Sequence, residues 1–363
     1  MPEGGSAGCR VAVDWHLVGR PHHDETDVAR YQRALAAALA AYAAPGDDVW
    51  ALVAWPAAID VLGPGIGHAG IGHRESRSGD RGVRDMLATL RPDLAVFPHV
   101  APAGLPVPCA LVMHDALFAT HPEWLGRDAR ARTPARSVRA VMEARLIIAV
   151  SQAARIEVLS VIDPPPARVA VIPPAPDPAF VPTQHAPARV RARYGLDRYC
   201  VAIGDTDPRG NLTHLADAVA RLGVPGLAVV SAQRPPRRRH AVPGIRYLGP
   251  LGDADRADLL AAAQAAASVS FCDGCGLGAL EALACGTPLV VSDRGALGEV
   301  VADAAIVVPP SVDAIAEGVR AVLGPDVADR LRVAGPLRAG AYTPARLGTA
   351  AWDAVRSATG ATR

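Results

Sequence analysis

The sequence alternates between short apolar runs and longer alanine-rich segments with helical periodicity. The apolar runs are continuous, which is typical of parallel strands covered on both faces. In the first half we expect strands at Val11–Val13, Val49–Ala54, Leu94–Phe97, Ala110–Met113, Leu146–Val150 and Val169–Ile172. In the second half we expect strands at Cys200–Ile203, Leu227–Ser231, Ile245–Leu248, Ser268–Phe271, Leu289–Val291 and Ile306–Val308. The pattern predicts an α/β protein with two Rossmann-like, doubly wound domains.

A proline-dense stretch without periodicity separates the two halves. We place the linker near residues 173–192, between an N-terminal domain over 1–175 and a C-terminal domain over 190–343. The segment 344–363 is helix-like, and we expect it to pack back on the N-terminal domain. The length of 363 residues fits two domains of roughly 100–200 residues each.

Charge and hydropathy narrow the class of partner. The net charge of +1 argues against nucleic acid, so we expect a neutral or small anionic ligand. The start has no basic flank before an apolar run, and no later run reaches the roughly 18–20 apolar residues of a membrane span. We therefore predict a cytoplasmic protein without a transmembrane segment. Peripheral attachment to a membrane and oligomerisation stay open.

Two further features of composition bear on the chemistry. All 37 basic residues are arginine, so no Schiff-base, pyridoxal phosphate or P-loop lysine is available. Among the six cysteines, Cys272 and Cys275 form a single CxxC without nearby histidines. Such a pair is weak support for zinc, and we favour buried reduced thiols and predict no metal site.

The most informative stretch is FCDGCGLGALEALACGTPLVVSD, from Phe271 to Asp293. A helix that begins about Gly276 and ends before Pro288 places Glu281 on the same face as its apolar residues. A carboxylate that faces a core needs a polar partner, because an unpaired buried charge is costly. Glu281 is therefore expected to point inward and to meet either a ligand or a core arginine.

The start of the same helix predicts an anion site. The backbone N–H groups of Gly276, Leu277 and Gly278 are expected to be free and to accept a phosphate. Asp273 lies within reach of the same ligand. A phosphate flanked by two hydroxyl-binding carboxylates describes a nucleotide sugar. The alternative is a helix start with Asp273 as its capping acid.

Two other candidates follow predicted strands, where ligands of α/β sheets bind. His114 can hydrogen-bond a sugar hydroxyl, with a core histidine satisfied by Asp115 as the alternative. Arg209 can clamp a pyrophosphate, and a solvated turn arginine is the competing interpretation. The arginine-rich run at 234–240 is interpreted as a solvated loop.

Several segments match one family in order along the chain. The sequence resembles family 4 of the retaining glycosyltransferases, which have the GT-B architecture of two facing Rossmann-like domains. The matching segments are RVAVDWHLVG near the start, LVMHDALFATHPEW at 111–124, IIAVSQAARIEVL at 147–159, VAVIPPAPDPAF at 169–180, IGDTDPRGNLTHLADAVARL at 203–222, IRYLGPL at 245–251 and FCDGCGLGALEALACGTPLVVSDRGALGEVVADAAIVVPP at 271–310.

The resemblance implies a role for each candidate. Glu281 would bind the ribose diol, Asp273 and His114 would contact the transferred sugar, and the amides at 276–278 would hold the phosphates. Arg209 would stabilise the departing diphosphate, and Leu251 belongs to a loop expected to read the base.

The sequence also departs from the family at the donor-phosphate site. Asp273 replaces the usual glutamate, and Gly210 and Asp205 stand where members carry a lysine and an arginine or small residue. Asp27 and Ala29 replace glycines of the usual donor loop.

The implied function is transfer of a sugar from a nucleoside-diphosphate sugar to a hydroxyl or amine, without a required metal or other cofactor. The acceptor would be a small molecule, a glycan or a lipid-linked compound. The alternative is a degenerate, non-catalytic relative that acts as a binding or partner subunit.

Overall fold

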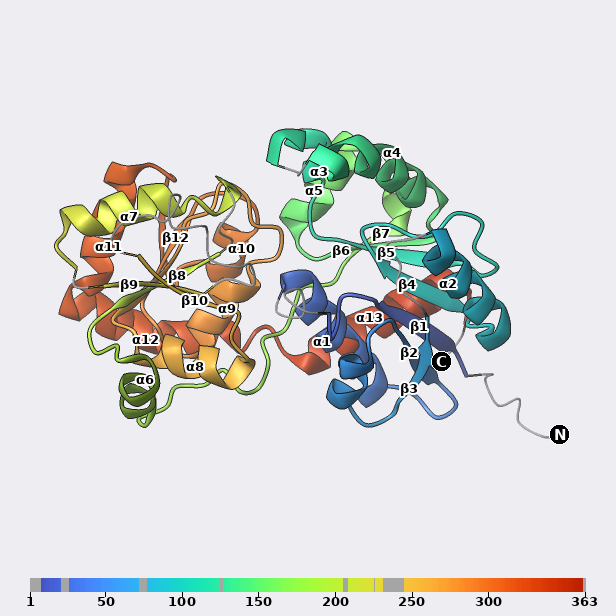
Figure 1. Cartoon of the computed structure of the whole chain (residues 1–363), viewed down its shortest axis with the longest axis horizontal. Helices are drawn as coiled ribbons and strands as arrows, with labels where there is room; N and C mark the ends of the chain where they lie inside the picture. The colour runs from blue at the N-terminus through green and yellow to red at the C-terminus, as the bar shows by residue number, and fades with distance from the viewer. Residues whose placement is uncertain are drawn as a thin grey trace. The chain divides into compact units, whose positions relative to one another are not determined.

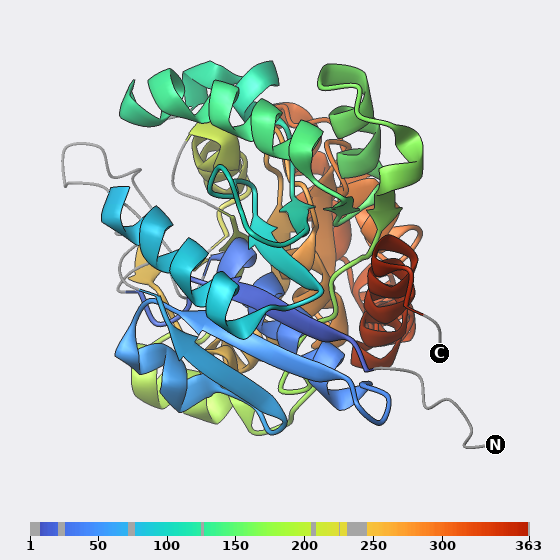
Figure 2. The same ribbon diagram turned by 90° about the vertical axis from the view of Figure 1, so that its right-hand side faces the viewer.

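The structure is a computed structural model of the chain, and it describes residues 8–20, 26–71, 77–124, 127–204, 208–224, 226–230 and 245–361. The chain divides into two compact units. The N-terminal unit comprises Met1–Pro174 together with Pro344–Arg363, and the C-terminal unit comprises Ala175–Thr343. Each unit is a parallel sheet with helices on both faces (Figures 1 and 2). This is the α/β architecture that the apolar runs predicted.

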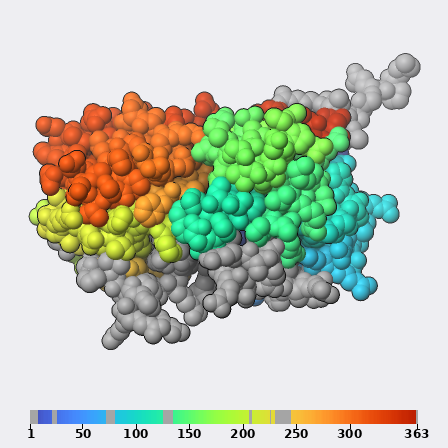
Figure 3. Space-filling model, turned by 90° about the horizontal axis from the view of Figure 1, so that it is seen from above, coloured from blue at the N-terminus to red at the C-terminus, as the bar shows by residue number. Residues whose placement is uncertain are grey.

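The N-terminal unit contains a seven-stranded parallel sheet in the order β3-β2-β1-β4-β5-β6-β7. Its strands are β1 Arg10–Trp15, β2 Asp48–Val53, β3 Ile66–Gly70, β4 Leu94–Pro98, β5 Cys109–Met113, β6 Leu146–Ala149 and β7 Val169–Val171. Its helices are α1 Asp27–Ala41, α2 Arg77–Leu90, α3 Leu117–Thr120, α4 Arg127–Glu143, α5 Gln152–Val161 and α13 Pro344–Thr359, with 3-10 turns η1 Pro56–Val61, η2 Pro122–Trp124 and η3 Pro166–Arg168. The green segments of Figure 3 place α3, α4 and α5 at the surface of this unit.

The C-terminal unit contains a six-stranded parallel sheet in the order β10-β9-β8-β11-β12-β13. Its strands are β8 Cys200–Ile203, β9 Leu227–Val230, β10 Ile245–Gly249, β11 Ala265–Ser268, β12 Leu289–Ser292 and β13 Ile306–Val308. Its helices are α6 Ala186–Tyr194, α7 Leu212–Arg221, α8 Asp253–Ala262, α9 Leu277–Ala284, α10 Leu297–Val301, α11 Val312–Leu323 and α12 Pro325–Ala339, with the 3-10 turn η4 Pro208–Gly210.

Local chemistry explains several element boundaries. Thr26, Ser151 and Ser311 each accept a hydrogen bond from a backbone N–H in the first turn of α1, α5 and α11, which satisfies one of the unpaired donors there. The last helix, α13, packs on α1. Trp352 is 2% exposed, and its indole Nε1 donates to the carbonyl of Leu39 at 2.8 Å. The chain thus returns to the N-terminal unit at its end.

The predicted elements differ from the structure at three places. The strand expected at Ser268–Phe271 lies at Ala265–Ser268, because its alanines have a low strand propensity but are held between β8 and β12. The glycine-containing strand β3 was missed; it pairs only with β2, at the edge of the sheet. The predicted linker contains α6, which buries Ala186 and Val190 one helical turn apart.

Candidate functional site

In each sheet the strand order reverses at one point, and ligands of such sheets bind beyond the carboxyl ends of the strands there. In the C-terminal unit this point lies between β8 and β11. The loops after these strands carry Arg209 and Asp273. The backbone N–H of Phe271 donates to the carbonyl oxygen of Arg209 at 2.8 Å, so the two loops are directly joined.

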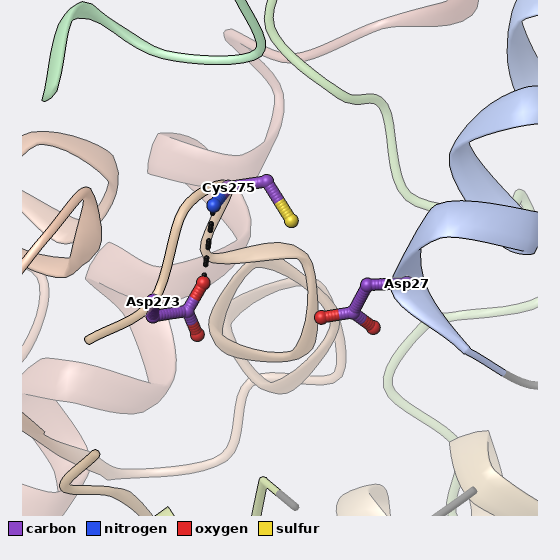
Figure 4. A group of neighbouring side chains, drawn as sticks. All are labelled: Asp27, Asp273 and Cys275. Carbon is purple, nitrogen blue, oxygen red and sulfur yellow. Dashed lines mark hydrogen bonds between the residues drawn. The ribbon is translucent and has the colours of Figure 1, made fainter. Parts of the chain in front are cut away.

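The loop before α9 is organised by Asp273. Its Oδ1 accepts a hydrogen bond from the backbone N–H of Cys275 at 3.1 Å (Figure 4). The same oxygen accepts from the backbone N–H of Gly276 at 2.7 Å. The carbonyl of Asp273 accepts from Ala296 at 2.7 Å, and a side chain at Gly295 would place its Cβ only 2.1 Å from that carbonyl oxygen. The expectation that the Gly276 N–H is free was therefore wrong, since Asp273 accepts from it within the loop that leads into α9.

The N–H groups of Leu277 and Gly278 belong to the first turn of α9, where no intrahelical acceptor exists. Both residues are buried. An added Cβ at Gly278 would lie 2.3 Å from Cγ2 of Ile203, the last residue of β8. Glycine at this position therefore lets the start of α9 pack directly against the carboxyl end of β8.

Glu281 points inward, as its helical position predicted, and is 1% exposed. Its Oε2 forms an ion pair and hydrogen bond with Nη2 of Arg256, which is 7% exposed. Removing either partner would leave a buried charge behind, at a cost of about 3–5 kcal/mol. One interpretation of Glu281 paired it with a core arginine, and that arginine is Arg256.

Arg256 was not named from the sequence, although a signal existed. It lies in α8 at a position that shares one face with Leu259 and Leu260, both buried. A single arginine on an apolar helix face is the complement of a single glutamate on another. Its guanidinium also lies 5.5 Å from the ring centroid of Phe180, and its Nη1 lies 3.8 Å from Oδ1 of Asp253. Arg256 is therefore fixed by packing as well as by charge.

The other candidates of this unit occupy different positions. Arg209 lies in η4 and is half-buried, while Gly210 beside it is buried. Leu251 lies two residues beyond β10 and is 9% exposed. Asp205 and the arginine-rich run at 234–240 lie outside the described residues.

In the N-terminal unit, His114 directly follows β5 and is 5% exposed. Its ring centroid lies 5.4 Å from that of Tyr31 in an edge arrangement, and 5.4 Å from that of His99 in a tilted one. The hydroxyl of Tyr31 donates to the carbonyl of Ile172 at 2.8 Å. Asp115 accepts from the backbone N–H of Leu117 at 3.1 Å. The imidazole of His114 is therefore held between an aromatic ring and a second imidazole.

The sequence interpretation missed two groups near this edge. His99 follows β4 and has φ 56°, a backbone conformation that a non-glycine residue rarely adopts. Asp14, at the end of β1, is 1% exposed, and its Oδ2 lies 3.0 Å from Nδ1 of His16. Both follow predicted strands, and that position was the available signal. The positive φ of His99 has no sequence signature.

The six cysteines form no disulfide; five of them are buried and Cys272 is half-buried. Within either unit taken alone, the described residues include no group of three His, Cys, Asp or Glu side chains placed to hold a metal ion. No helix in the described part of the chain is both long and apolar enough to cross a membrane.

Comparison with known proteins relates the C-terminal unit to a glycosyltransferase family. Residues 197–324 match the family described as glycosyl transferases group 1. This segment contains Arg209, Leu251, Arg256, Asp273 and Glu281.

Two curated relatives are mannosyltransferases. The chain is 50% identical over 72 residues to O-antigen chain mannosyltransferase B of Escherichia coli, a match covering 20% of this chain and 19% of the relative. It is 37% identical over 139 residues to MMP alpha-(1->4)-mannosyltransferase of Mycolicibacterium hassiacum, covering 34% of this chain and 33% of the relative. The matches thus span a third or less of these relatives.

Solved structures show the fold of the whole chain. Sucrose-phosphate synthase from Thermosynechococcus elongatus superposes with a TM-score of 0.79 at 17% identity, covering 98% of this chain and 100% of that one. Anabaena HepE in complex with UDP-glucose superposes with a TM-score of 0.74 at 15% identity, covering 96% of this chain and 99% of that one. The chain therefore has the GT-B fold, with two Rossmann-like units.

Proposed function

We propose that this protein is a retaining glycosyltransferase that moves a sugar from a nucleoside-diphosphate sugar to a hydroxyl or amine acceptor. The observation that carries the proposal is the loop–helix segment 273–281. It brings together the carboxyl edge of a parallel sheet, the N-terminus of α9 and a buried carboxylate held by an arginine. The family match of residues 197–324 supports it independently.

The nucleotide is assigned to the C-terminal unit. Glu281 would accept hydrogen bonds from the ribose diol. Its ion pair with Arg256 is compatible with this role, because a carboxylate has about four acceptor positions on its two oxygens. Arg256 would then keep the carboxylate ionised and fixed before the ribose arrives. HepE, which shares the fold, has been solved with UDP and with UDP-glucose, which supports a nucleotide-sugar ligand.

The diphosphate would lie against the start of α9. The N–H groups of Leu277 and Gly278 and the positive end of the helix favour an anion there. Arg209 would take the part of the lysine that Gly210 replaces, since its guanidinium can bind two phosphate oxygens at once. As the donor bond breaks, negative charge grows on the leaving diphosphate. Groups already aimed at that charge lower the barrier.

The sugar and the acceptor complete the assignment. Asp273 and His114 are proposed to hydrogen-bond the transferred sugar, and Leu251 to lie beside the base. The leaving phosphate would itself take the acceptor proton, so no step requires a metal ion or other cofactor. We propose a small-molecule, glycan or lipid-linked acceptor and a cytoplasmic location, with attachment at a membrane surface as the alternative.

One observation favours a second function. Asp273 already accepts two backbone hydrogen bonds in the loop before α9, and Glu281 is already paired with Arg256. Both acids thus satisfy groups of this chain, which suits a non-catalytic, glycosyltransferase-like binding or partner subunit. The two functions differ in turnover, since only an enzyme consumes the donor.

The test is a panel of nucleoside-diphosphate sugars with uridine, guanosine and thymidine as nucleosides, incubated with mixed acceptors and analysed by mass spectrometry. An active enzyme releases the free diphosphate and forms a glycoside, and NMR of that glycoside reports whether the anomeric configuration is retained. Glu281→Gln serves as the control for contaminating activity. Diphosphate binding without any donor turnover would instead support the binding subunit.

A further inference from the structure

We propose that Asn211 is a positioning residue for the diphosphate site, and this inference rests on the proposed function. Asn211 lies between η4, which carries Arg209, and α7. Its side chain holds the loops after β8, β11 and β13 in one arrangement. Neither the sequence pattern nor the assignment of the catalytic groups includes it.

The side chain of Asn211 does not serve its own helix. It is the N-cap residue of α7, where an asparagine normally accepts a hydrogen bond from the first turn, yet it makes no such bond. Its Nδ2 instead donates to the carbonyl oxygen of Val269 at 2.9 Å and to that of Pro310 at 3.1 Å. Both acceptors are carbonyls, so the amide nitrogen must be the atom that faces them.

The two acceptors belong to loops far apart in the sequence. Val269 directly follows β11 and begins the loop that contains Asp273, and Pro310 follows β13. The loop after β11 also donates from the N–H of Phe271 to the carbonyl of Arg209. The segment 209–211 is therefore bonded to the loop after β11 at two points, through Asn211 to Val269 and through Arg209 to Phe271.

The backbone of Asn211 supports the same conclusion. Its φ of 56° lies in the left-handed region, and the residue is only 5% exposed. A conformation that is unfavourable for most side chains persists only where the surroundings fix it, and such positions cluster at functional sites. Asparagine adopts it more readily than most residues and also supplies the two donors that the loops require.

The consequence concerns the geometry of phosphate binding. Arg209 and the first turn of α9 can bind one diphosphate only if the loops after β8 and β11 keep their spacing. Preorganised charge stabilisation depends on this, because donors that must move first lose their advantage. Loss of the Asn211 amide should therefore weaken diphosphate binding although Asn211 itself touches no phosphate in this scheme.

Three substitutions separate the side chain from the backbone. Asn211→Gly keeps the left-handed conformation easily accessible and removes the amide. Asn211→Asp keeps the size but replaces the donating group by an acceptor. Asn211→Ala loses both the donors and the tolerance of positive φ. His214→Phe is the matched control, because His214 also binds the carbonyl of Pro310, at 3.1 Å. Phenylalanine removes this hydrogen bond and can keep the edge contact of the His214 ring with Phe271 in the loop after β11.

Calorimetric titration with uridine, guanosine and thymidine diphosphates measures the effect. We expect Asn211→Gly to weaken binding roughly tenfold, as for loss of two neutral hydrogen bonds, and Asn211→Asp to weaken it further. His214→Phe should change it less than about threefold. Wild-type affinity in Asn211→Gly would overturn the proposal, as would an equal loss in His214→Phe.

Hydrogen exchange distinguishes failure of this inference from failure of the proposed function. If the wild-type protein binds none of the diphosphates, the proposed function fails. The role of Asn211 in fixing the loop after β11 can still be measured. The Phe271 N–H should exchange at least about tenfold faster in Asn211→Gly than in wild type, because its loop is released. Unchanged exchange at Phe271 would overturn the role of Asn211 whatever the protein binds.

Discussion

The two sheets share one topological plan but differ in the chemistry at their carboxyl edges. In the N-terminal unit the strand order reverses between β1 and β4, and the residues there are the Asp14–His16 pair and His99. In the C-terminal unit it reverses between β8 and β11, where Arg209 and Asp273 follow the strands. The buried Arg256–Glu281 pair lies on the neighbouring helices α8 and α9.

The difference fits the two kinds of ligand group in the proposed function. Imidazole and aromatic groups suit a neutral, hydroxyl-rich molecule, since they hydrogen-bond without requiring a counter-charge. A half-buried arginine, on a loop bonded to the one before α9, and a helix N-terminus suit a diphosphate, and a buried carboxylate suits a diol. This supports the proposed division, in which the C-terminal edge binds the nucleotide and the N-terminal edge contacts a neutral, hydroxyl-rich molecule.

The strongest test concerns the ion pair of the C-terminal unit. Arg256→Met should lower the free energy of unfolding by about 3–5 kcal/mol, because the buried carboxylate of Glu281 would lose its ion pair. The double variant with Glu281→Gln should recover most of this loss, since no charge then remains. Denaturant unfolding measures the free energy of unfolding of the single and the double variant. The same measurement on His16→Gln, which changes the Asp14–His16 pair of the N-terminal unit, serves as the comparison. Equal stability of Arg256→Met and wild type would show that the pair is not formed in solution.

Arg209 tests the assignment of charge stabilisation. Arg209→Ala should reduce turnover by a factor of about 10²–10³, as for removal of one preorganised group. Its side chain is half-buried, so the free energy of unfolding should change little. Steady-state kinetics and thermal unfolding give the two readouts. Full activity would move the phosphate clamp to another residue.

Glu281 tests the nucleotide assignment. Glu281→Gln keeps the volume but removes the charge that binds the ribose, and it should weaken diphosphate binding by about 1.5–3 kcal/mol. Arg256 loses its partner as well, so stability should also fall, and the titration must be made well below the unfolding temperature. A stability loss with unchanged affinity would make Glu281 a structural partner alone.

His114 tests the other edge. His114→Ala should lower turnover about tenfold, the effect of one lost hydrogen bond to a neutral hydroxyl, and leave diphosphate affinity nearly unchanged. His99→Ala should act in the same direction, because the two rings lie 5.4 Å apart. The reverse pattern, with affinity lost and turnover per bound donor kept, would place the nucleotide at this edge instead.

Two buried thiols give the smallest effect. Burial raises the pKa of Cys109 to about 11 and that of Cys285 to about 12, from an ordinary value of 9.0. Because the folded state favours the protonated thiols, their contribution to the free energy of unfolding is fully present below pH 9.0. This contribution is lost as the pH rises from 9.0 towards about 11 for Cys109 and about 12 for Cys285. At pH 8 both should resist alkylation in the native state. In mild denaturant, bound diphosphate should slow alkylation of Cys285, in the C-terminal unit, more than alkylation of Cys109, in the N-terminal unit. Equal slowing at both cysteines would contradict the assignment of the nucleotide to the C-terminal unit.

The helical faces and the ends of most strands could be predicted from the sequence, because both follow from the spacing of apolar residues along the chain. The inward direction of Glu281 and the place of His114 were predicted in this way. The partner of Glu281 was not, since Arg256 lies on a separate helix and only packing brings the two together. The Gly276 N–H was wrongly expected to be free, and the alternative, with Asp273 as a capping acid, came nearer, because aspartate side chains often accept from backbone N–H groups a few residues later. The positive φ values of His99 and Asn211 were not predicted either, because residue type only makes this conformation more accessible and tertiary contacts select it.

The most direct test of the division is hydrogen exchange across the whole chain with and without uridine, guanosine and thymidine diphosphates. We predict that at least one diphosphate slows exchange at the N–H groups of Leu277 and Gly278, with smaller changes around His99 and His114. Protection confined to the N-terminal unit would contradict the account. Exchange that is unchanged by all three diphosphates would contradict it as well.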